Sequence, residues 1–147
     1  MPSIIPSYVY TLFASMIVGT LLICAFSAST LKIRSDAERQ ETENLAQYVA
    51  TKSCELISTV ASNTTAGLTL DLPGFVGDQR YWIRIANDSD VAWVEIGYGT
   101  TPQATQQHVP IPAKVSASGS YVSGSGAAQL ECYSDNDEIF LGLSGGS

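Results

Sequence analysis

Charged residues are missing from the start of this sequence, where none precedes Lys32. The 7 basic and 14 acidic side chains all lie at or beyond that residue, and they give the chain a net charge of -7. Beyond Lys52 the only basic residues are Arg80, Arg84 and Lys114. So few cations cannot form a patch that neutralises a run of phosphates. The composition therefore excludes nucleic acid as a partner.

Histidine is also scarce, and the sequence lacks the residue patterns of common catalytic sites. The only histidine, His108, lies in "ATQQHVPIP", where no neighbour would make it a base or a metal ligand. No Ser/His/Asp arrangement and no glycine-rich phosphate loop is present. We expect a surface histidine, no enzymatic activity, no cofactor and no bound metal.

Two acidic turns, "NDSD" (87–90) and "SDNDE" (134–138), offer oxygen ligands that suit calcium. They lack the full spacing of an EF-hand loop, and we interpret them as solvated turns. The alternative, a calcium site, would use Asp88, Asp90, Asp135, Asp137 and Glu138.

Proline is absent from Tyr10 to Ser58, and strong helix formers fill the middle of this stretch. We expect one helix from about Ser7 to about Ala61, roughly 80 Å long at 1.5 Å per residue. Its uncharged part, Ile4 to Leu31, would span about 42 Å, which exceeds the roughly 30 Å hydrocarbon core of a bilayer. This part can cross a membrane.

The uncharged part leaves two further alternatives open. A removed signal peptide would need a basic start, which is absent, although "AFSAS" (25–29) imitates a cleavage site. Small residues spaced as Ser15-x-x-x-Gly19 and Ala25-x-x-x-Ser29 would let apolar helices approach closely, but ordinary membrane-helix composition explains them as well.

From Lys32 the pattern becomes amphipathic, with apolar residues at three- and four-residue steps and acidic residues filling much of the rest. We expect this half of the helix to pack on its own domain. The predicted contact positions are Ile33, Ala37, Leu45, Tyr48, Val49, Lys52 and Leu56.

After Gly67 the period changes to two, which is typical of strands. Seven short strands are predicted, at 67–72, 80–86, 91–98, 108–117, 119–124, 127–133 and 138–143. We expect an α+β protein: a spine helix over 1–62 (apolar over 1–31, amphipathic over 32–62), and a β-sandwich or open-barrel head over 63–147.

The strand "VAWVEIGY" (91–98) has two alternating sets of side chains. Ala92, Val94, Ile96 and Tyr98 are predicted to face the core, which leaves Trp93 near a rim or interface. The four residues Trp82, Trp93, Tyr98 and Tyr121 would form an adhesive aromatic patch, or else serve core packing and contacts between heads.

Several features favour a domain outside the cytoplasm. Asn63 and Asn87 match the N-glycosylation pattern. Cys54 and Cys132 either form a disulfide, worth roughly 4 kcal/mol for so long a loop, or remain two buried thiols; Cys24 in the apolar part is interpreted as a small hydrophobe.

The basic pair after the apolar part points the other way. Lys32 and Arg34 would place that end in the cytoplasm by the positive-inside rule. A basic leader removed on export would resolve the conflict. The alternatives are a cytoplasmic domain, or a signal weakened by Asp36 and Glu38.

The whole architecture resembles that of archaeal type IV pilins and archaellins. The helix "SMIVGTLLICAFSASTLKIRSDAERQ" is similar to their filament-core helix, and "QRYWIRIANDSDVAWVEIGYG" and "KVSASGSYVSGSGAAQLECY" look like the heads of archaeal pilin-like proteins. The resemblance implies a short basic leader cut by a prepilin peptidase, then assembly by a cytoplasmic ATPase and a membrane platform. It also implies an extracellular filament for adhesion or motility, membrane-inserted before assembly.

In such a filament the apolar helix would pack against copies of itself. The predicted contacts are Val9, Leu12, Phe13, Met16, Ile17, Gly19, Leu21, Phe26 and Leu31. The alternative is a single-pass, membrane-anchored β-sandwich protein that binds the cell-surface layer, resembling the archaellum stator, with lipid around the helix in place of other subunits.

Overall fold

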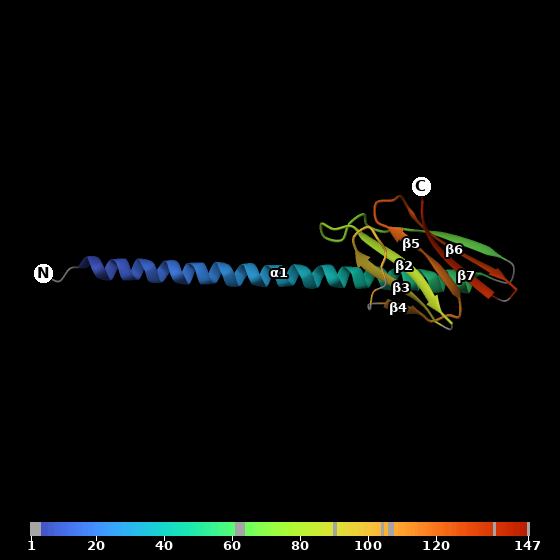
Figure 1. The fold of residues 1–147 in the computed structure, drawn as a ribbon, viewed down its shortest axis with the longest axis horizontal. Coiled ribbons are helices and arrows are strands. Elements are labelled where there is room, and N and C mark those ends of the chain that lie inside the picture. Colours follow the sequence, from blue (N-terminus) through green and yellow to red (C-terminus); the bar gives the residue numbers. More distant parts are fainter. Residues whose placement is uncertain are drawn as a thin grey trace. The chain divides into compact units, whose positions relative to one another are not determined.

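The fold is known from a computed structural model that describes residues 4–60, 64–89, 91–103, 105, 108–136 and 138–146, with side chains from residue 7 onward. One helix, α1 (Ile4–Thr59), precedes seven strands (Figure 1). The strands are β1 (Thr65–Leu70), β2 (Tyr81–Asp88), β3 (Val91–Tyr98), β4 (His108–Ile111), β5 (Ser116–Val122), β6 (Ala128–Asp135) and β7 (Glu138–Gly145). The predicted α+β class and the seven strands are confirmed.

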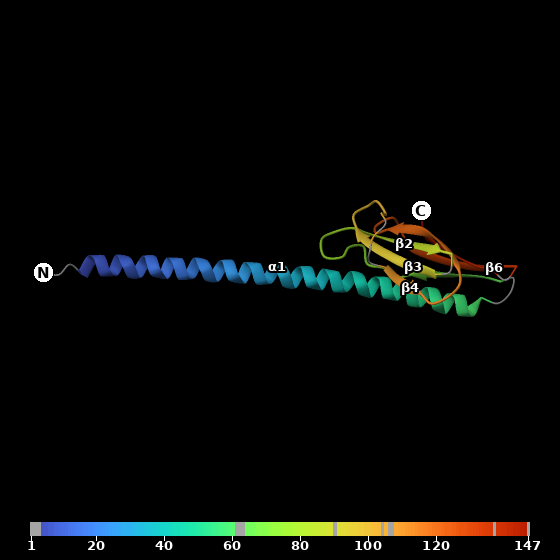
Figure 2. The same ribbon diagram turned by 60° about the horizontal axis from the view of Figure 1, so that its bottom comes forward.

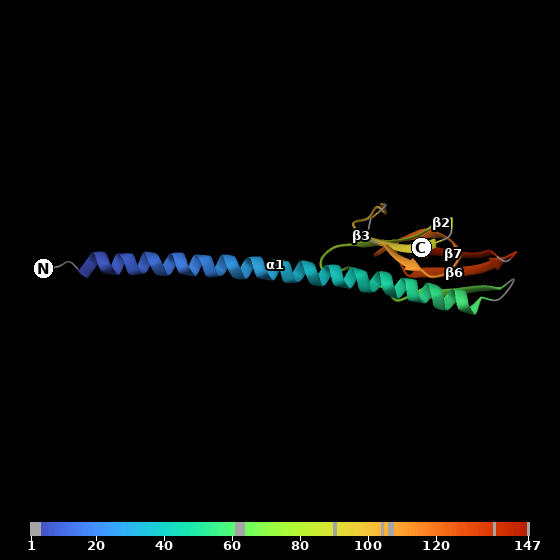
Figure 3. The ribbon, with the colours of Figure 1, turned by 90° about the horizontal axis from the view of Figure 1, so that it is seen from below.

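The seven strands form one sheet in the order β1-β6-β7-β5-β2-β3-β4, in place of the two packed sheets of a sandwich. All neighbours are antiparallel except β5 and β7, which are parallel. The carboxyl-terminal part of α1 lies along one face of this sheet (Figures 2 and 3). The helix therefore supplies the second layer that a sandwich would have taken from another sheet.

The chain divides into two compact units, residues 1–37 and residues 38–147. The boundary lies inside α1, and not at residues 62–63, where the sequence analysis placed the start of the head. The reason is that Ala46, Val49, Ala50 and Leu56 belong to the same buried core as the strands. The second half of the helix is thus part of the head.

The buried stripe of α1 begins later than predicted. Thr42, Ala46, Val49, Ser53 and Leu56 are buried, at steps of four and three residues. Ile33, by contrast, is 70% exposed, and Lys52 keeps about a third of its side chain in solvent. The stripe follows contact with the sheet, because the helical residues that share the buried core of the strands begin at Ala46.

Buried hydroxyls in this stripe satisfy their hydrogen-bonding capacity within the helix. Ser53 Oγ donates to the carbonyl oxygen of Val49 at 2.8 Å, and Thr42 Oγ1 donates to that of Arg39 at 2.7 Å. Since an unpaired buried hydroxyl costs roughly 1–3 kcal/mol, this back-bonding makes two polar residues acceptable in the core.

The alternation predicted for residues 91–98 is confirmed for three of its four core positions. Ala92, Val94 and Ile96 face the helix and are buried, together with Ile83 on the neighbouring strand β2. Tyr98 is 42% exposed because it stands at the end of β3, where Gly99 begins a loop. The opposite set, which includes Trp93, lies on the sheet face that points away from α1, called here the outer face.

Candidate functional site

The residues predicted for the filament core all lie within residues 8–31 of α1, called here the apolar segment. Every large apolar member is exposed, from 46% for Val9 to 71% for Phe26. Other large apolar side chains of the segment, such as Tyr8, Leu22 and Ile23, are exposed as well, so the helix has no polar face here. A soluble monomer does not sustain so large a continuous apolar surface, so lipid or protein must cover it.

The hydroxyls of the apolar segment do not oppose such a cover. Thr11, Thr20 and Thr30 each donate to the carbonyl oxygen four residues earlier, at 2.9–3.0 Å, and Ser15 donates to that of Leu12 at 2.8 Å. These donors are satisfied inside the helix, as a medium without water requires. These four hydroxyls therefore do not make the segment polar.

Gly19 leaves a gap on the surface of the apolar segment. Apart from Gly19 itself, its two chain neighbours and the nearby helix backbone, no heavy atom of the described residues lies within 4 Å of the position that a Cβ would take there. Ser15 is one helical turn away on the same side of the helix, so two small residues adjoin. Another helix can approach the backbone of α1 more closely here than at its leucines and phenylalanines.

Within the described chain, α1 is the one helix that is long and apolar enough to cross a membrane, and none of its apolar window is buried in the rest of the protein. This finding agrees with membrane insertion of the segment as an anchor or as a signal. Lys32 and Arg34 lie at its carboxyl-terminal end, as basic residues do beside membrane spans.

A second group of polar residues lies on the outer face, called here the Glu95 cluster (Arg84, Trp93, Glu95 and His108). Glu95 is 3% exposed, and its Oε2 accepts from Arg84 Nη2 at 2.6 Å and from Arg84 Nε at 2.9 Å. Its Oε1 accepts from Trp93 Nε1 at 2.9 Å. The ring of His108 lies 5.7 Å from that of Trp93. The buried charge is therefore paired, with a donor on each oxygen.

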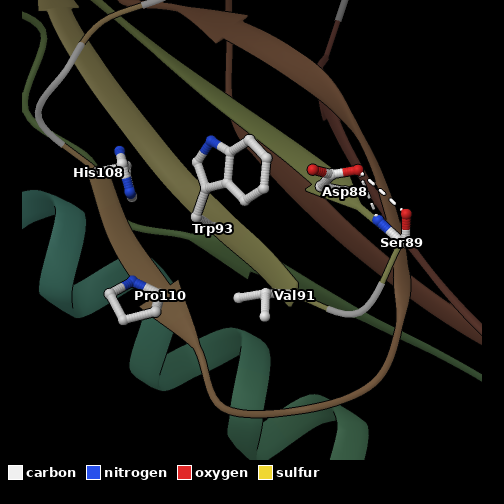
Figure 4. Close-up of a pocket in the computed structure, with 6 residues that line it drawn as sticks. All are labelled: Asp88, Ser89, Val91, Trp93, His108 and Pro110. Carbon is white, nitrogen blue, oxygen red and sulfur yellow. Dashed lines mark hydrogen bonds between the residues drawn. The ribbon is translucent and has the colours of Figure 1, made fainter.

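A shallow depression of about 480 Å³ adjoins this cluster, called here the Trp93 depression. It is lined by Asp88, Ser89, Val91, Trp93, His108 and Pro110 (Figure 4). Sequence reasoning placed Trp93 near a rim but missed its neighbours. The outward-facing set of β3 was the available signal, whereas the pairing of Trp93 with Pro110 and of Glu95 with His108 depends on a register that the sequence does not reveal.

The four aromatic residues of the predicted patch are not brought together on the surface. Trp82 and Tyr121 are buried, at 2% and 4% exposure, and Tyr98 belongs to the helix-facing set of β3. Only Trp93 combines partial exposure with a place on the outer face. The patch interpretation therefore fails for the set, and core packing holds for two of its members.

The predicted cysteine pair, glycosylation positions and acidic turns lie outside the apolar segment and the Glu95 cluster. Cys54 and Cys132 are free thiols, so the disulfide alternative is not realised, and burial raises the pKa of Cys132. Asn87 is exposed at the end of β2, whereas Asn63 lies outside the described residues. No three His, Cys, Asp or Glu side chains among the described residues are grouped to hold a metal ion; Asp90 and Asp137 fall outside that description.

Comparison with known proteins adds no relative: the chain matches no family model, no curated protein and no solved structure.

Proposed function

We propose that this chain is the structural subunit of an extracellular helical filament, similar to archaeal type IV pili and archaella, that serves adhesion or motility. The apolar segment would form the filament core by packing against copies of itself. The unit over residues 38–147 would form the filament surface. No catalytic role is proposed.

The observation that carries the proposal is the exposure of the apolar segment on all its sides, in a helix whose second half is already packed under a sheet. A membrane anchor alone also explains an apolar helix. The open Gly19 position additionally suits close helix–helix packing.

Assembly of such a filament has a simple energetic basis. A subunit waits in the bilayer, where the apolar segment is covered by lipid, and then exchanges lipid for identical helices. A head-to-tail contact that does not close on itself generates an open helical polymer. By resemblance, a prepilin peptidase would release the subunit, and an assembly ATPase with its membrane platform would drive the exchange.

One observation favours a second candidate function, a single-pass membrane protein whose head binds the cell-surface layer. The apolar segment is long and apolar enough to span a membrane by itself, and none of its apolar window is buried within the protein. In that case lipid remains the cover of the segment and no polymer forms.

The test separates the two candidates by where the chain is found. Producing cells are sheared, the released material is sedimented and imaged by electron microscopy, and the amino terminus of this chain is read by mass spectrometry. Thin filaments that contain the chain, with a leader removed from the encoded product, are expected. A chain that stays in the membrane as a detergent-soluble monomer with its encoded start intact would refute the polymer and favour the anchored protein.

A further inference from the structure

We propose that the Trp93 depression is a carbohydrate-binding site that takes a neutral sugar ring. The inference concerns the unit over residues 38–147 alone and does not depend on polymerisation. The register of three strands forms this site: Asp88 of β2 lies opposite Val91 of β3, and Trp93 of β3 lies opposite Pro110 of β4. The pairing brings a carboxylate, an indole and two apolar side chains to one place on the outer face.

The indole of Trp93 is held in place before any ligand arrives. Its Nε1 donates to Glu95 at 2.9 Å, and Glu95 is in turn fixed by Arg84. The donor of the ring is thus occupied, and Trp93 offers apolar surface to a ligand. A ring fixed by such contacts loses little conformational entropy on binding, which favours recognition at a shallow site.

The polar side of the depression is formed by Asp88 and Ser89. Asp88 Oδ1 accepts from the backbone N of Ser89 at 2.8 Å and from Ser89 Oγ at 3.3 Å. Oδ2 accepts nothing from the residues that the structure describes. The turn therefore orients a carboxylate with one oxygen available to accept charge-assisted hydrogen bonds. Figure 4 shows Asp88 and Ser89 on one side of Trp93 and His108 on the other.

A sugar ring matches this combination better than the other classes of small ligand. It has an apolar C–H face that can pack on the indole, and hydroxyls at its edge that can donate to Asp88 and exchange hydrogen bonds with Ser89. An anion would be repelled by Asp88, and a wholly apolar ligand would leave that carboxylate desolvated without a partner. A small number of convergent polar groups beside an aromatic wall is typical of specific ligand sites.

The test uses tryptophan emission, because the chain has 2 tryptophans and one of them, Trp82, is buried. In a Trp82→Phe variant of the full chain, Trp93 is the sole indole. The chain is kept in a polyoxyethylene detergent, which has neither a sugar nor an ammonium headgroup. It is titrated with glucose, galactose, mannose and N-acetylglucosamine, and with tetramethylammonium as a cationic probe.

We expect a saturable change in Trp93 emission with at least one of these sugars, with a Kd of about 1 mM or below. Asp88→Asn should weaken that binding about tenfold, since it removes the charge that accepts from the sugar hydroxyls. Asp135→Asn, the same change in another exposed turn, should leave it unaltered. Equilibrium dialysis of labelled forms of the same sugars against the unaltered chain gives a second measurement of binding that needs no tryptophan substitution.

Three outcomes would overturn the proposal. One is the absence of saturable binding by any of the four sugars in both measurements. Another is equal binding by the chain and its Asp88→Asn variant. The third is tighter binding of tetramethylammonium than of every sugar, which would make the depression a site for organic cations.

Discussion

At the scale of single residues, Glu95 is a charge buried beneath the outer face with a donor on each oxygen. Arg84→Leu should lower the free energy of unfolding by about 2–3 kcal/mol, because it leaves the carboxylate buried without its counter-ion. This expected loss of stability is smaller than that for breaking a fully buried ion pair, since 31% of the Arg84 side chain is exposed. Urea unfolding of the full chain, followed by near-ultraviolet circular dichroism, measures the change.

The matched control is the double variant Arg84→Leu/Glu95→Leu. It removes both charges, and most of the lost stability should return, because no unpaired carboxylate remains. A single variant as stable as the unaltered chain would show that solvent, and not Arg84, satisfies Glu95.

Tyr81 makes the stability of the head sensitive to alkaline pH. Its side chain is fully buried, its hydroxyl donates to the carbonyl oxygen of Pro73 at 2.6 Å, and burial raises its pKa. Unfolded tyrosine loses its proton near pH 10, which the folded residue still retains. Above that pH, stability should therefore fall by about 1.4 kcal/mol per pH unit, until the folded residue also ionises.

Tyr81→Phe tests this linkage. It should cost about 1 kcal/mol at pH 7 through the lost hydrogen bond, yet lose less stability than the unaltered chain between pH 7 and pH 11. Some decline should persist, because burial also raises the pKa of Tyr98 and of Cys132. Urea midpoints at the two pH values provide the comparison, and equal declines in both proteins would contradict the assignment.

Gly119 occupies a position in β5 that no other residue fits. Its φ of 122° is rare for L residues, and a Cβ there would collide with the backbone of Leu143 on β7. Gly119→Ala should destabilise the head by about 1–3 kcal/mol. The control is Gly142, on the same strand as Leu143. Among the described residues, a Cβ there would come no closer than 4.0 Å to a neighbour, the carbonyl oxygen of Glu131, so Gly142→Ala should stay within about 1 kcal/mol of the unaltered chain. Thermal unfolding of both variants measures the difference in stability, and equal unfolding midpoints would contradict the prediction.

At the scale of elements, the apolar segment carries the assembly prediction. Gly19→Leu should abolish filaments, because four added carbons fill the place where a second helix would approach. Gly19→Ala adds one carbon and should reduce filament yield without abolishing it. Sheared material is quantified by electron microscopy, and near-ultraviolet circular dichroism checks that the head is folded. Normal filaments from Gly19→Leu would exclude close packing at this position.

The elements themselves could largely be predicted from the sequence, because they depend on local periodicity. The alternation over residues 91–98 identified both the strand and its core face. The segment predicted at 108–117 is instead divided: β4 ends at Ile111, before Pro112, and β5 begins at Ser116. Proline removes a backbone donor, and here that effect outweighed a pattern of apolar residues that continued across it.

Arrangements that depend on pairing between distant residues could not be predicted in the same way. The parallel neighbours β5 and β7 are separated by β6 in the sequence, and no local signal specifies that order. The Trp93 depression depends on such pairing too, since Trp93 and Pro110 meet only through the β3–β4 register. The apolar segment was found readily because a run of uncharged residues is a property of composition.

At the scale of the whole molecule, the boundary at residues 37–38 decides which part can fold alone. Residues 38–147 contain the sheet and the helical stripe that covers it. Burial of a side chain such as Val49 or Leu56 contributes about 1.5–3 kcal/mol, against a total stability of only about 5–15 kcal/mol for a typical domain. A sheet without its helix would therefore lose most of what holds it folded.

Two truncated chains test this division. Residues 38–147 should be a detergent-free monomer whose unfolding midpoint is close to that of the head in the full chain, since the apolar segment contributes nothing to the core. Residues 63–147, the head as the sequence analysis bounded it, should aggregate or remain unfolded, because the core face around Ile83 and Val94 would be exposed to water. Size-exclusion chromatography and circular dichroism compare the two. A folded, monomeric 63–147 chain would mean that the sheet is stable without α1, and an unfolded 38–147 chain would mean that the apolar segment supports the head.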